Sequence, residues 1–585
     1  MGSIKFFQNS ICAFAGLTLA YWVCVLVGAS QNTGTALVFF FAIIFWIVSA
    51  LSRKHENDKK GNEFVCMLVL SCAVAAAATF LYAFNPDDST FFHRFAYLRL
   101  NGEIFSPAYD TRIAFDKVAP ISAAHLITSW EFALTTVGAG LGSEVLGYQV
   151  GGTLVSIILY TFAVNYTVSH FFPNSSASIR VFTAASVILF LFFDADLNRR
   201  IGAWLFLGGW TGKCFLSAAL IILFPSFDKA YETNRPKDWF FAFCVMVFFV
   251  GLTGSSLFIL PLALGVLVFI ELIFHKGVKL RPTSLFVSAV PLFVGGVFIY
   301  KFGSLRDDSY WRGFEAMAFS DYVWLCLSGK ALFMYLFLIP IFLCKAIDIK
   351  KSRLLRFSVY QLLLAAFLLN PLFYPLFFKL VPSDGFWRVY YLFQYPTVVA
   401  ILVGTTLEYI KMGSYKKAFT LGAIYIALVI AGGSVISLQA QWGYPHHFKN
   451  FLAEKLSEAE LVSVKQSAKK CARYEGFSVL LAPEQWEVTA QMLEPSLSSV
   501  AARHMQHNFS NTDASQITVP ESVRIGARNF VSGLPGGSDK DFEFFIKKEI
   551  SLIVLRPQIE SSAIPMLGEY RKVFSDDNYV VFCRN

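Results

Sequence analysis

Residues 11–27, ICAFAGLTLAYWVCVLV, carry no charged side chain over seventeen positions. A helix of that length can cross the hydrocarbon core of a bilayer, which is about 30 Å thick. The segment lacks a cleavage site of the A-x-A type and a strongly basic start, so we interpret it as a retained helix and not a signal peptide. Similar apolar runs recur as far as Ile436, and they predict a polytopic membrane protein.

The composition supports this fold class. The chain has 585 residues, of which 56% are hydrophobic and 15% charged, whereas a soluble domain has about 25% charged residues. We therefore expect a polytopic α-helical membrane protein with about 13 transmembrane helices. Spans seven and eight can also form one hairpin broken at 251–254. The expected spans are residues 8–28, 33–52, 63–83, 144–169, 179–193, 201–224, 239–253, 255–274, 283–300, 322–344, 356–379, 389–410 and 418–438.

Positive charge predicts the orientation of these helices. Five connecting segments with several Lys or Arg residues fall on one side of the expected spans, and short positively charged loops stay in the cytoplasm. An odd number of spans then places the N-terminus inside and the C-terminus outside. The five segments are residues 53–60, 229–237, 276–281, 345–356 and 411–417.

The composition changes at about Gln441 to charged and Ser-rich sequence. We expect residues 1–440 to form the transmembrane domain and 441–585 a small extracytoplasmic α/β domain, with a helix at 451–473. Strands are expected at 477–482, 551–555 and 579–582. Cys471 and Cys583 can pair in an oxidising compartment or remain thiols, because two cysteines do not define a disulfide framework.

Short loops on the outer side should contain few Lys and Arg residues. The first outer loop, residues 84–129, departs from this rule because it contains cations beside acidic residues. Its segment 91–100 has aromatic and aliphatic residues on one helical face and His93, Arg94 and Arg99 largely on the other. That pattern is typical of a helix lying in the membrane interface, where it would cover a site. The alternative is that these charges only solvate the loop and bind lipid headgroups.

Asp87 and Asp88 follow Pro86 at the start of this loop. One of them can cap the helix that follows. Capping requires a single side chain, so the second carboxylate is a candidate general base or metal ligand. A partly desolvated aspartate can accept a proton from a hydroxyl near neutral pH.

Three more features are expected on the same side. Asp194 and Asp196 form a D-x-D sequence that can chelate a divalent cation, although the tripeptide is common. Lys213 lies in an apolar run, where a cation is expensive and therefore usually functional or paired. Arg388 opens span twelve between aromatic residues, as an interface anchor or a phosphate ligand.

Together these features resemble the GT-C superfamily of membrane glycosyltransferases, which includes oligosaccharyltransferases, protein mannosyltransferases, aminoarabinose transferases and bacterial arabinofuranosyltransferases. The resemblance rests on an Asp-Asp pair in the first long outer loop, about a dozen spans and a C-terminal extracytoplasmic domain. The short sequences at 129–131, 212–213 and 387–388 also look like parts of bacterial proteins of this type.

The resemblance implies an enzyme of the bacterial inner membrane that transfers a sugar, with arabinofuranose as the first candidate, from a polyprenyl-phosphate donor to a glycan or protein acceptor. Asp87 or Asp88 would be the base, and Asp194 with Asp196 lies where some members carry a second acidic motif. No feature predicts nucleic-acid binding, and a divalent metal is the one cofactor to consider.

The chemistry requires a base, cations that stabilise the departing phosphate, and an apolar groove for the lipid. The candidate phosphate ligands are Arg388, Lys213, Arg94 and Arg99. The candidate substrate-binding residues are Trp130, Glu131, Trp387, Tyr390 and His93. A flippase or transporter of lipid-linked glycans, or an O-antigen-type polymerase or ligase, is the alternative function, although the chain shows few acidic residues within its spans.

Overall fold

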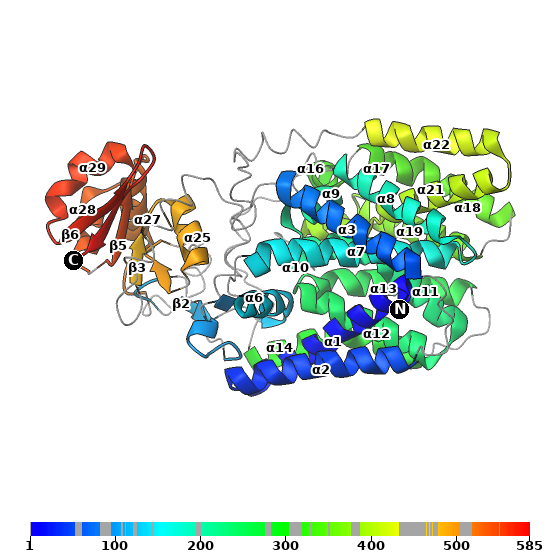
Figure 1. Cartoon of the computed structure of the whole chain (residues 1–585), viewed down its shortest axis with the longest axis horizontal. Coiled ribbons are helices and arrows are strands. Elements are labelled where there is room, and N and C mark those ends of the chain that lie inside the picture. Colours follow the sequence, from blue (N-terminus) through cyan, green and yellow to red (C-terminus); the bar gives the residue numbers. More distant parts are fainter. Residues whose placement is uncertain are drawn as a thin grey trace.

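The structure is a computed structural model of the whole chain, and Figure 1 shows a helical bundle with a smaller domain at one end. We call the end of the bundle beside that domain the domain-side end and the opposite end the far end. The structure describes residues 2–52, 61–81, 95–96, 98–106, 109–110, 113–116, 118–120, 126–141, 146–194, 200–274, 282–302, 319–327, 329–348, 352–375, 386–431, 464, 467, 471, 478–494, 496–501, 517–548 and 550–585.

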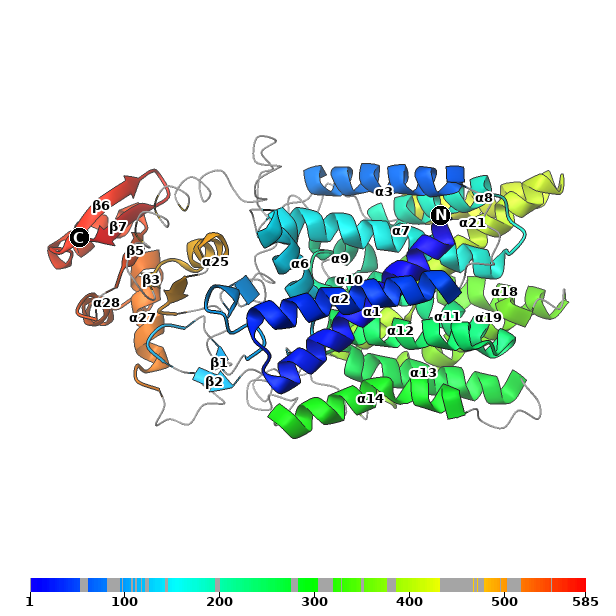
Figure 2. The same ribbon diagram turned by 60° about the horizontal axis from the view of Figure 1, so that its bottom comes forward.

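Helices dominate the bundle and lie roughly side by side (Figures 1 and 2). Each predicted span overlaps at least one helix. In chain order the main helices are α1 (Ser3–Val27), α2 (Gln31–Ser52), α3 (Gly61–Leu81), α6 (Trp130–Gly140), α7 (Gly152–Phe171), α8 (Ala177–Phe192), α9 (Ile201–Gly208), α10 (Gly212–Ala219), α11 (Leu223–Thr233), α12 (Pro236–Leu252), α13 (Ser256–Phe274), α14 (Pro282–Phe302), α16 (Phe319–Cys326), α17 (Gly329–Phe333), α18 (Ile339–Asp348), α19 (Ser352–Leu368), α21 (Tyr395–Lys411) and α22 (Tyr415–Ile430).

Within the described ranges, seven helices are long and apolar enough to cross a membrane, so the chain is an integral membrane protein. The predicted count of 13 is not confirmed, because several predicted spans are short or interrupted helices. The run predicted at 322–344, for example, contains α16, α17, the π-helix η4 (Met334–Leu338) and part of α18. The seven helices are Ser3–Val27, Gln31–Ser52, Gly147–Phe171, Gly212–Thr233, Ser256–Phe274, Pro282–Phe302 and Trp387–Lys411.

Spans seven and eight are two helices, α12 and α13, joined by a turn at residues 253–255. A Cβ atom at Gly251 would lie within 3 Å of side-chain atoms of Thr18 and Ser129. Ser129 also donates its backbone N–H to the Gly251 carbonyl oxygen at 2.8 Å. The end of α12 is therefore packed directly against α1 and the segment that leads into α6.

The C-terminal domain is built on a five-stranded mixed sheet with the order β4-β3-β5-β7-β6. Strands β3 (Ser478–Leu481), β5 (Leu552–Leu555) and β7 (Val580–Arg584) confirm the three predicted strands. The sequence prediction missed β4 (Leu497–Ser499) and β6 (Tyr570–Ser575), which are the two edge strands and are short or largely exposed. Most of the helix predicted at 451–473 lies outside the described residues.

Both faces of this sheet are covered. Leu481 and Ile553 belong to one hydrophobic core, whereas their neighbours Leu480 and Leu552 belong to a second core, as expected when successive side chains of a strand point to opposite faces. The surrounding helices are α25 (Glu484–Leu493), α27 (Glu521–Ser532), α28 (Asp539–Ile546) and α29 (Pro557–Ala563).

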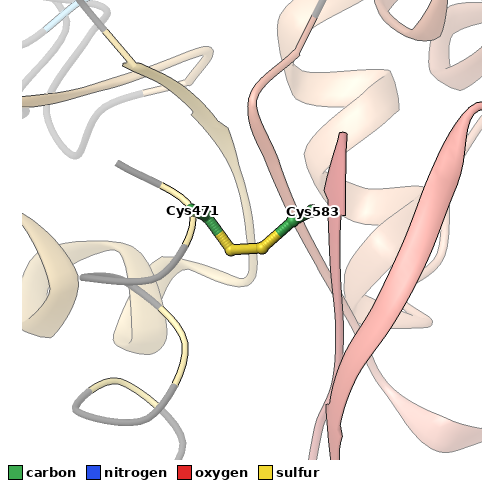
Figure 3. Close-up of a disulfide and its surroundings, with 2 residues drawn as sticks. All are labelled: Cys471 and Cys583. Atoms are coloured by element: carbon green, nitrogen blue, oxygen red, sulfur yellow. A yellow bond between two sulfur atoms is a disulfide. The ribbon is translucent and has the colours of Figure 1, made fainter. Parts of the chain in front are cut away.

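Cys471 and Cys583 form a disulfide, with their Cα atoms 5.4 Å apart (Figure 3). Cys583 lies on β7, and Cys471 belongs to the hydrophobic core that covers the same face of the sheet. The bond therefore ties residue 471 to the last strand of the chain. Of the two states that the sequence allowed for these cysteines, the structure contains the paired one.

Candidate functional site

The domain-side end of the bundle contains a broken helix. The apolar run predicted as span 201–224 is interrupted at residues 209–211, between α9 and α10. A Cβ atom at Gly212 would lie 1.8 Å from the Leu252 carbonyl oxygen. Only glycine allows this approach, and it brings the N-terminus of α10 against the C-terminal end of α12. Lys213 consequently lies in the first turn of α10.

Two residues of α6 bind this break. The Glu131 carboxylate accepts a hydrogen bond from the Gly212 backbone N–H at 3.2 Å, and the Trp130 indole donates to the Trp210 carbonyl oxygen at 2.7 Å. Glu131 is 4% exposed. Burial raises the pKa of the Glu131 carboxyl to about 7, although the Gly212 N–H and the nearby Lys213 act in the opposite direction.

Lys213 and Arg388 each lie over one of two neighbouring indole rings. The Lys213 ammonium lies 5.8 Å from the centre of the Trp204 ring, and that ring lies 5.0 Å from the ring of Trp387. The Arg388 guanidinium carbon is 5.0 Å from the centre of the Trp387 ring. We call these four residues the aromatic–cation cluster. Both cations are within the distance at which an aromatic face attracts a positive charge.

Arg388 lies on the 3-10 helix η5 (Phe386–Leu392) and retains hydrogen-bonding capacity. One terminal guanidinium nitrogen donates to the Ser255 hydroxyl, which lies in the turn between α12 and α13. Among the described residues, the Arg388 Nε atom is buried without a hydrogen-bond partner, and so is the Nε1 atom of Trp204. Buried donors are normally paired, so these two donors are suited to a bound acceptor.

The other predicted residues near this site are held by the protein itself. Arg99 donates to the Thr135 carbonyl oxygen of α6 at 2.8 Å. Tyr390 is buried, with its ring stacked 6.1 Å from the ring of Phe393. Trp130 is 1% exposed and is committed to Trp210. The structure thus brings Lys213, Trp387 and Arg388 together, with Glu131 beside Lys213.

Asp194, a predicted metal ligand, is fully buried at the end of α8. The Tyr395 hydroxyl donates to one of its carboxylate oxygens at 2.5 Å, and Arg200 lies 4.0 Å from the other. Tyr395 also accepts the Ile201 backbone N–H at 3.2 Å. These bonds connect α8, α9 and α21. Within the described part of the chain, no group of three His, Cys, Asp or Glu side chains is arranged to hold a metal ion.

Five predicted site residues lie outside the described residues, namely Asp87, Asp88, His93, Arg94 and Asp196. Of the helix predicted at 91–100, residues 95–96 and 98–100 are helical, with Phe95 and Leu98 buried and Leu100 exposed. The loop beside the proposed base therefore packs at least partly onto the bundle.

Sequence reasoning missed Trp204 and Ser255. Lys213 and Arg388 attracted attention because cations are expensive near a membrane. A tryptophan and a serine carry no comparable signal, because tryptophan is common at membrane interfaces and serine is common in turns. Only the break between α9 and α10 explains why Trp204 faces Lys213.

No protein-family model matches the chain, and no curated protein has a significantly similar sequence. The apo crystal structure of the Archaeoglobus fulgidus oligosaccharyltransferase is similar with a TM-score of 0.50 at 10% identity, over 90% of this chain and 75% of that chain. The same archaeal enzyme in complex with an inhibitory peptide and a dolichol-phosphate gives a TM-score of 0.47 at 10% identity, over 86% and 70% of the two chains. At this identity the likeness concerns the fold alone, which this chain shares with the archaeal oligosaccharyltransferase.

Proposed function

We propose that this protein is a GT-C type glycosyltransferase that uses a polyprenyl-phosphate sugar as donor. The observation that carries the proposal is the aromatic–cation cluster, in which Lys213 lies over Trp204 and Arg388 over the neighbouring Trp387 at the break in a membrane helix. Broken helices near a membrane commonly direct polar groups and helix N-termini toward anionic ligands.

The cluster suits the leaving group of such a reaction. When the bond between the sugar and the lipid phosphate breaks, negative charge develops on the phosphate oxygens, and cations that are already in position stabilise it. An arginine can donate two parallel hydrogen bonds to a phosphate, and the Nε atom of Arg388 has a hydrogen bond to give. The indole faces offer a stacking surface for a sugar ring.

The remaining roles rest on sequence. Asp87 or Asp88 is the proposed base that activates the acceptor hydroxyl. In the same loop, Arg94 and Arg99 are proposed phosphate ligands and His93 is a proposed substrate contact. Asp194 and Asp196 are retained as a proposed metal site. The first donor to test is a polyprenyl-phosphate arabinofuranose, with a glycan or protein acceptor outside a bacterial inner membrane.

The decisive experiment compares Arg388→Lys with the parent in proteoliposomes that contain radiolabelled polyprenyl-phosphate sugars. Lysine keeps the charge but cannot reproduce the fork of a guanidinium, so we expect donor use to fall at least roughly tenfold, through a higher KM or a lower kcat. Arg556→Lys is a matched control, because Arg556 also lies over an aromatic ring, that of Tyr579 at 4.6 Å, but in the C-terminal domain.

Each outcome has a distinct meaning. Transfer by the parent that Arg388→Lys weakens and Arg556→Lys leaves unchanged supports the proposal. Donor kinetics of Arg388→Lys within about twofold of the parent would remove Arg388 from the phosphate site. Movement of labelled carrier across the bilayer without formation of a glycosidic bond would favour the flippase alternative.

A further inference from the structure

A short piece of the first outer loop lies inside the C-terminal domain. Ile113 forms a parallel β-bridge with Ser499, and the Ala114 N–H donates to the Ser499 carbonyl oxygen at 2.7 Å. Ser499 belongs to β4, which is an edge strand of the sheet. The loop therefore extends the sheet by one short strand segment, a recognition mode in which main-chain bonds supply the contact.

The same piece completes the core of that domain. Ile113 is 4% exposed and belongs to the hydrophobic core that contains Val500 and Phe545. The ring of Phe115 stacks on Phe545, with the ring centres 5.9 Å apart. Phe115 has a φ of 74°, in the left-handed region that a bulky residue rarely adopts. Such a conformation persists only where the surroundings impose it.

A buried ion pair fixes this docking. The Arg524 side chain of α27 is fully buried and donates to the Asp116 carboxylate. It also donates to the carbonyl oxygens of Ala114 at 2.9 Å and Val500 at 2.8 Å. The other oxygen of Asp116 accepts the Thr518 backbone N–H at 2.6 Å. Arg524 thus bonds to both the loop and the domain.

The loop is also anchored to the bundle on each side of this contact. Before it, Leu98, Ile104 and Phe105 are buried in the core of the bundle. After it, α6 holds the break at Gly212 through Glu131. Only residues 106–112 separate Phe105 from Ile113, and eight extended residue steps reach about 28 Å at most. The contact at 113–116 consequently couples the C-terminal domain to the loop segment that packs on the bundle and bonds to α6 through Arg99.

We propose that Arg524 is a positioning residue of the candidate functional site. By holding Asp116 in the C-terminal domain, it fixes the first outer loop at the domain-side end of the bundle. This inference rests on the proposed function only for its effect on turnover, because the placement of the loop can be measured without any reaction. It assigns the C-terminal domain a role in the geometry of the membrane site.

The first test measures hydrogen exchange of the full chain in nanodiscs. Arg524→Gln leaves Asp116 buried without its cation, so we expect faster exchange at residues 98–106 as well as at 113–116. Asp116→Asn is a milder second variant with the same expected direction, because the amide still accepts the Thr518 N–H. Lys572→Gln is the control, since it removes an exposed ion pair of the same domain, to Glu560 at 2.7 Å, and should leave both segments unchanged.

The second test restores the position of the loop at residue 113 without restoring the positive charge of Arg524. Ile113→Cys with Ser499→Cys places two thiols across the β-bridge, in a background where the cysteines other than Cys471 and Cys583 are serine. With a protease site introduced between residues 432 and 450, the disulfide keeps the two fragments together on a non-reducing gel. In the Arg524→Gln background, oxidation should return the exchange rates of residues 98–106 to the parental level.

Turnover supplies a third measurement. We expect Arg524→Gln to lower kcat by roughly tenfold to a hundredfold, as displacement of a catalytic loop does, and the 113–499 disulfide to restore it. Faster exchange confined to residues 517–548, or failure of the disulfide to rescue residues 98–106, would overturn the proposal. A parent without any transferase activity would refute the proposed function, while the exchange data would still decide whether Arg524 positions the loop.

Discussion

The two ends of the bundle use buried charge in different ways. At the far end, Glu63 of α3 binds Arg180 of α8, and Asp228 of α11 binds both His170 and Arg356. At the domain-side end, Asp194 is likewise held by Tyr395 and Arg200, but Arg388 contacts a hydroxyl and an aromatic ring and keeps an Nε donor without a described partner. Charges that satisfy one another connect helices, whereas a cation that faces neutral groups remains able to bind an anion.

The largest effect should come from the first outer loop. Replacing Asp87 or Asp88 by Asn removes a carboxylate and changes little else in shape. If one of them is the base, the corresponding variant should lose about 10²- to 10⁴-fold in turnover. The measurement is sugar transfer by the purified variants with the polyprenyl-phosphate donor.

The same variants should melt close to the parent, because substitutions in a loop between predicted spans usually change folding little. Full turnover by both single variants would show that neither aspartate is the base. The chemistry would then have to come from another carboxylate, and Glu131 would be the next one to replace.

The second prediction concerns the far end. Arg356→Met removes the guanidinium that binds Asp228, and it leaves a carboxylate buried beside His170. Breaking a buried pair by removing one partner costs about 3 to 5 kcal/mol. The unfolding free energy of the variant in detergent should fall by that amount, while the donor KM of the protein that remains folded stays unchanged. A raised donor KM would mean that the far end also serves binding.

Part of this arrangement can be predicted from the sequence. Long apolar runs predicted the helices, because burial in a bilayer requires an uninterrupted apolar segment. The break at residues 209–211 was missed because it depends on the close contact of Gly212 with Leu252, which lies 40 positions later. Lys213 and Arg388 were each singled out from the sequence as candidate phosphate ligands, and that role stays a prediction; their link through Trp204 and Trp387 is tertiary.

The contact between loop and domain lay beyond sequence reasoning for the same reason. In the sequence, Asp116 is one of several acidic residues in a charged loop, and nothing in its sequence context distinguishes Arg524. Nothing local connects two residues separated by more than 400 positions, yet they form a fully buried pair. The edge strand β4 was missed as well, because its three residues are too short to show a period.

The third prediction is a pH dependence at the domain-side end. Glu131 has its pKa raised to about 7 by burial, above the value of about 4.3 expected in the unfolded chain. The folded state therefore binds more protons than the unfolded state between those values, so stability should decrease as pH rises from about 5 to 7, by about 1 to 3 kcal/mol. Glu131→Gln resembles the protonated carboxyl and should remove this decrease. If the unfolding free energies of parent and variant change by the same amount between pH 5 and pH 7.5, the Glu131 pKa is not raised.

The smallest effect should come from Glu232, at the exposed edge of the far-end network. Glu232 binds Arg353 at 2.6 Å, and both side chains are 32% exposed, whereas Asp228 and Arg356 in the same network are buried. Because water screens the exposed pair and competes for its hydrogen bonds, Glu232→Gln should lower the unfolding free energy by less than about 1 kcal/mol. High salt should shrink that loss further, since the screening length of exposed charges falls from about 10 Å at 0.1 M to about 3 Å at 1 M. The Arg356→Met loss should persist in salt, because Asp228 is buried and, among the described residues, keeps only His170 as its partner. Unfolding measured for both variants at low and high salt checks this difference directly. Equal losses of unfolding free energy in the two variants would mean that burial does not decide how much an ion pair at the far end stabilises the fold. The difference that we draw between the two ends of the bundle would then not hold.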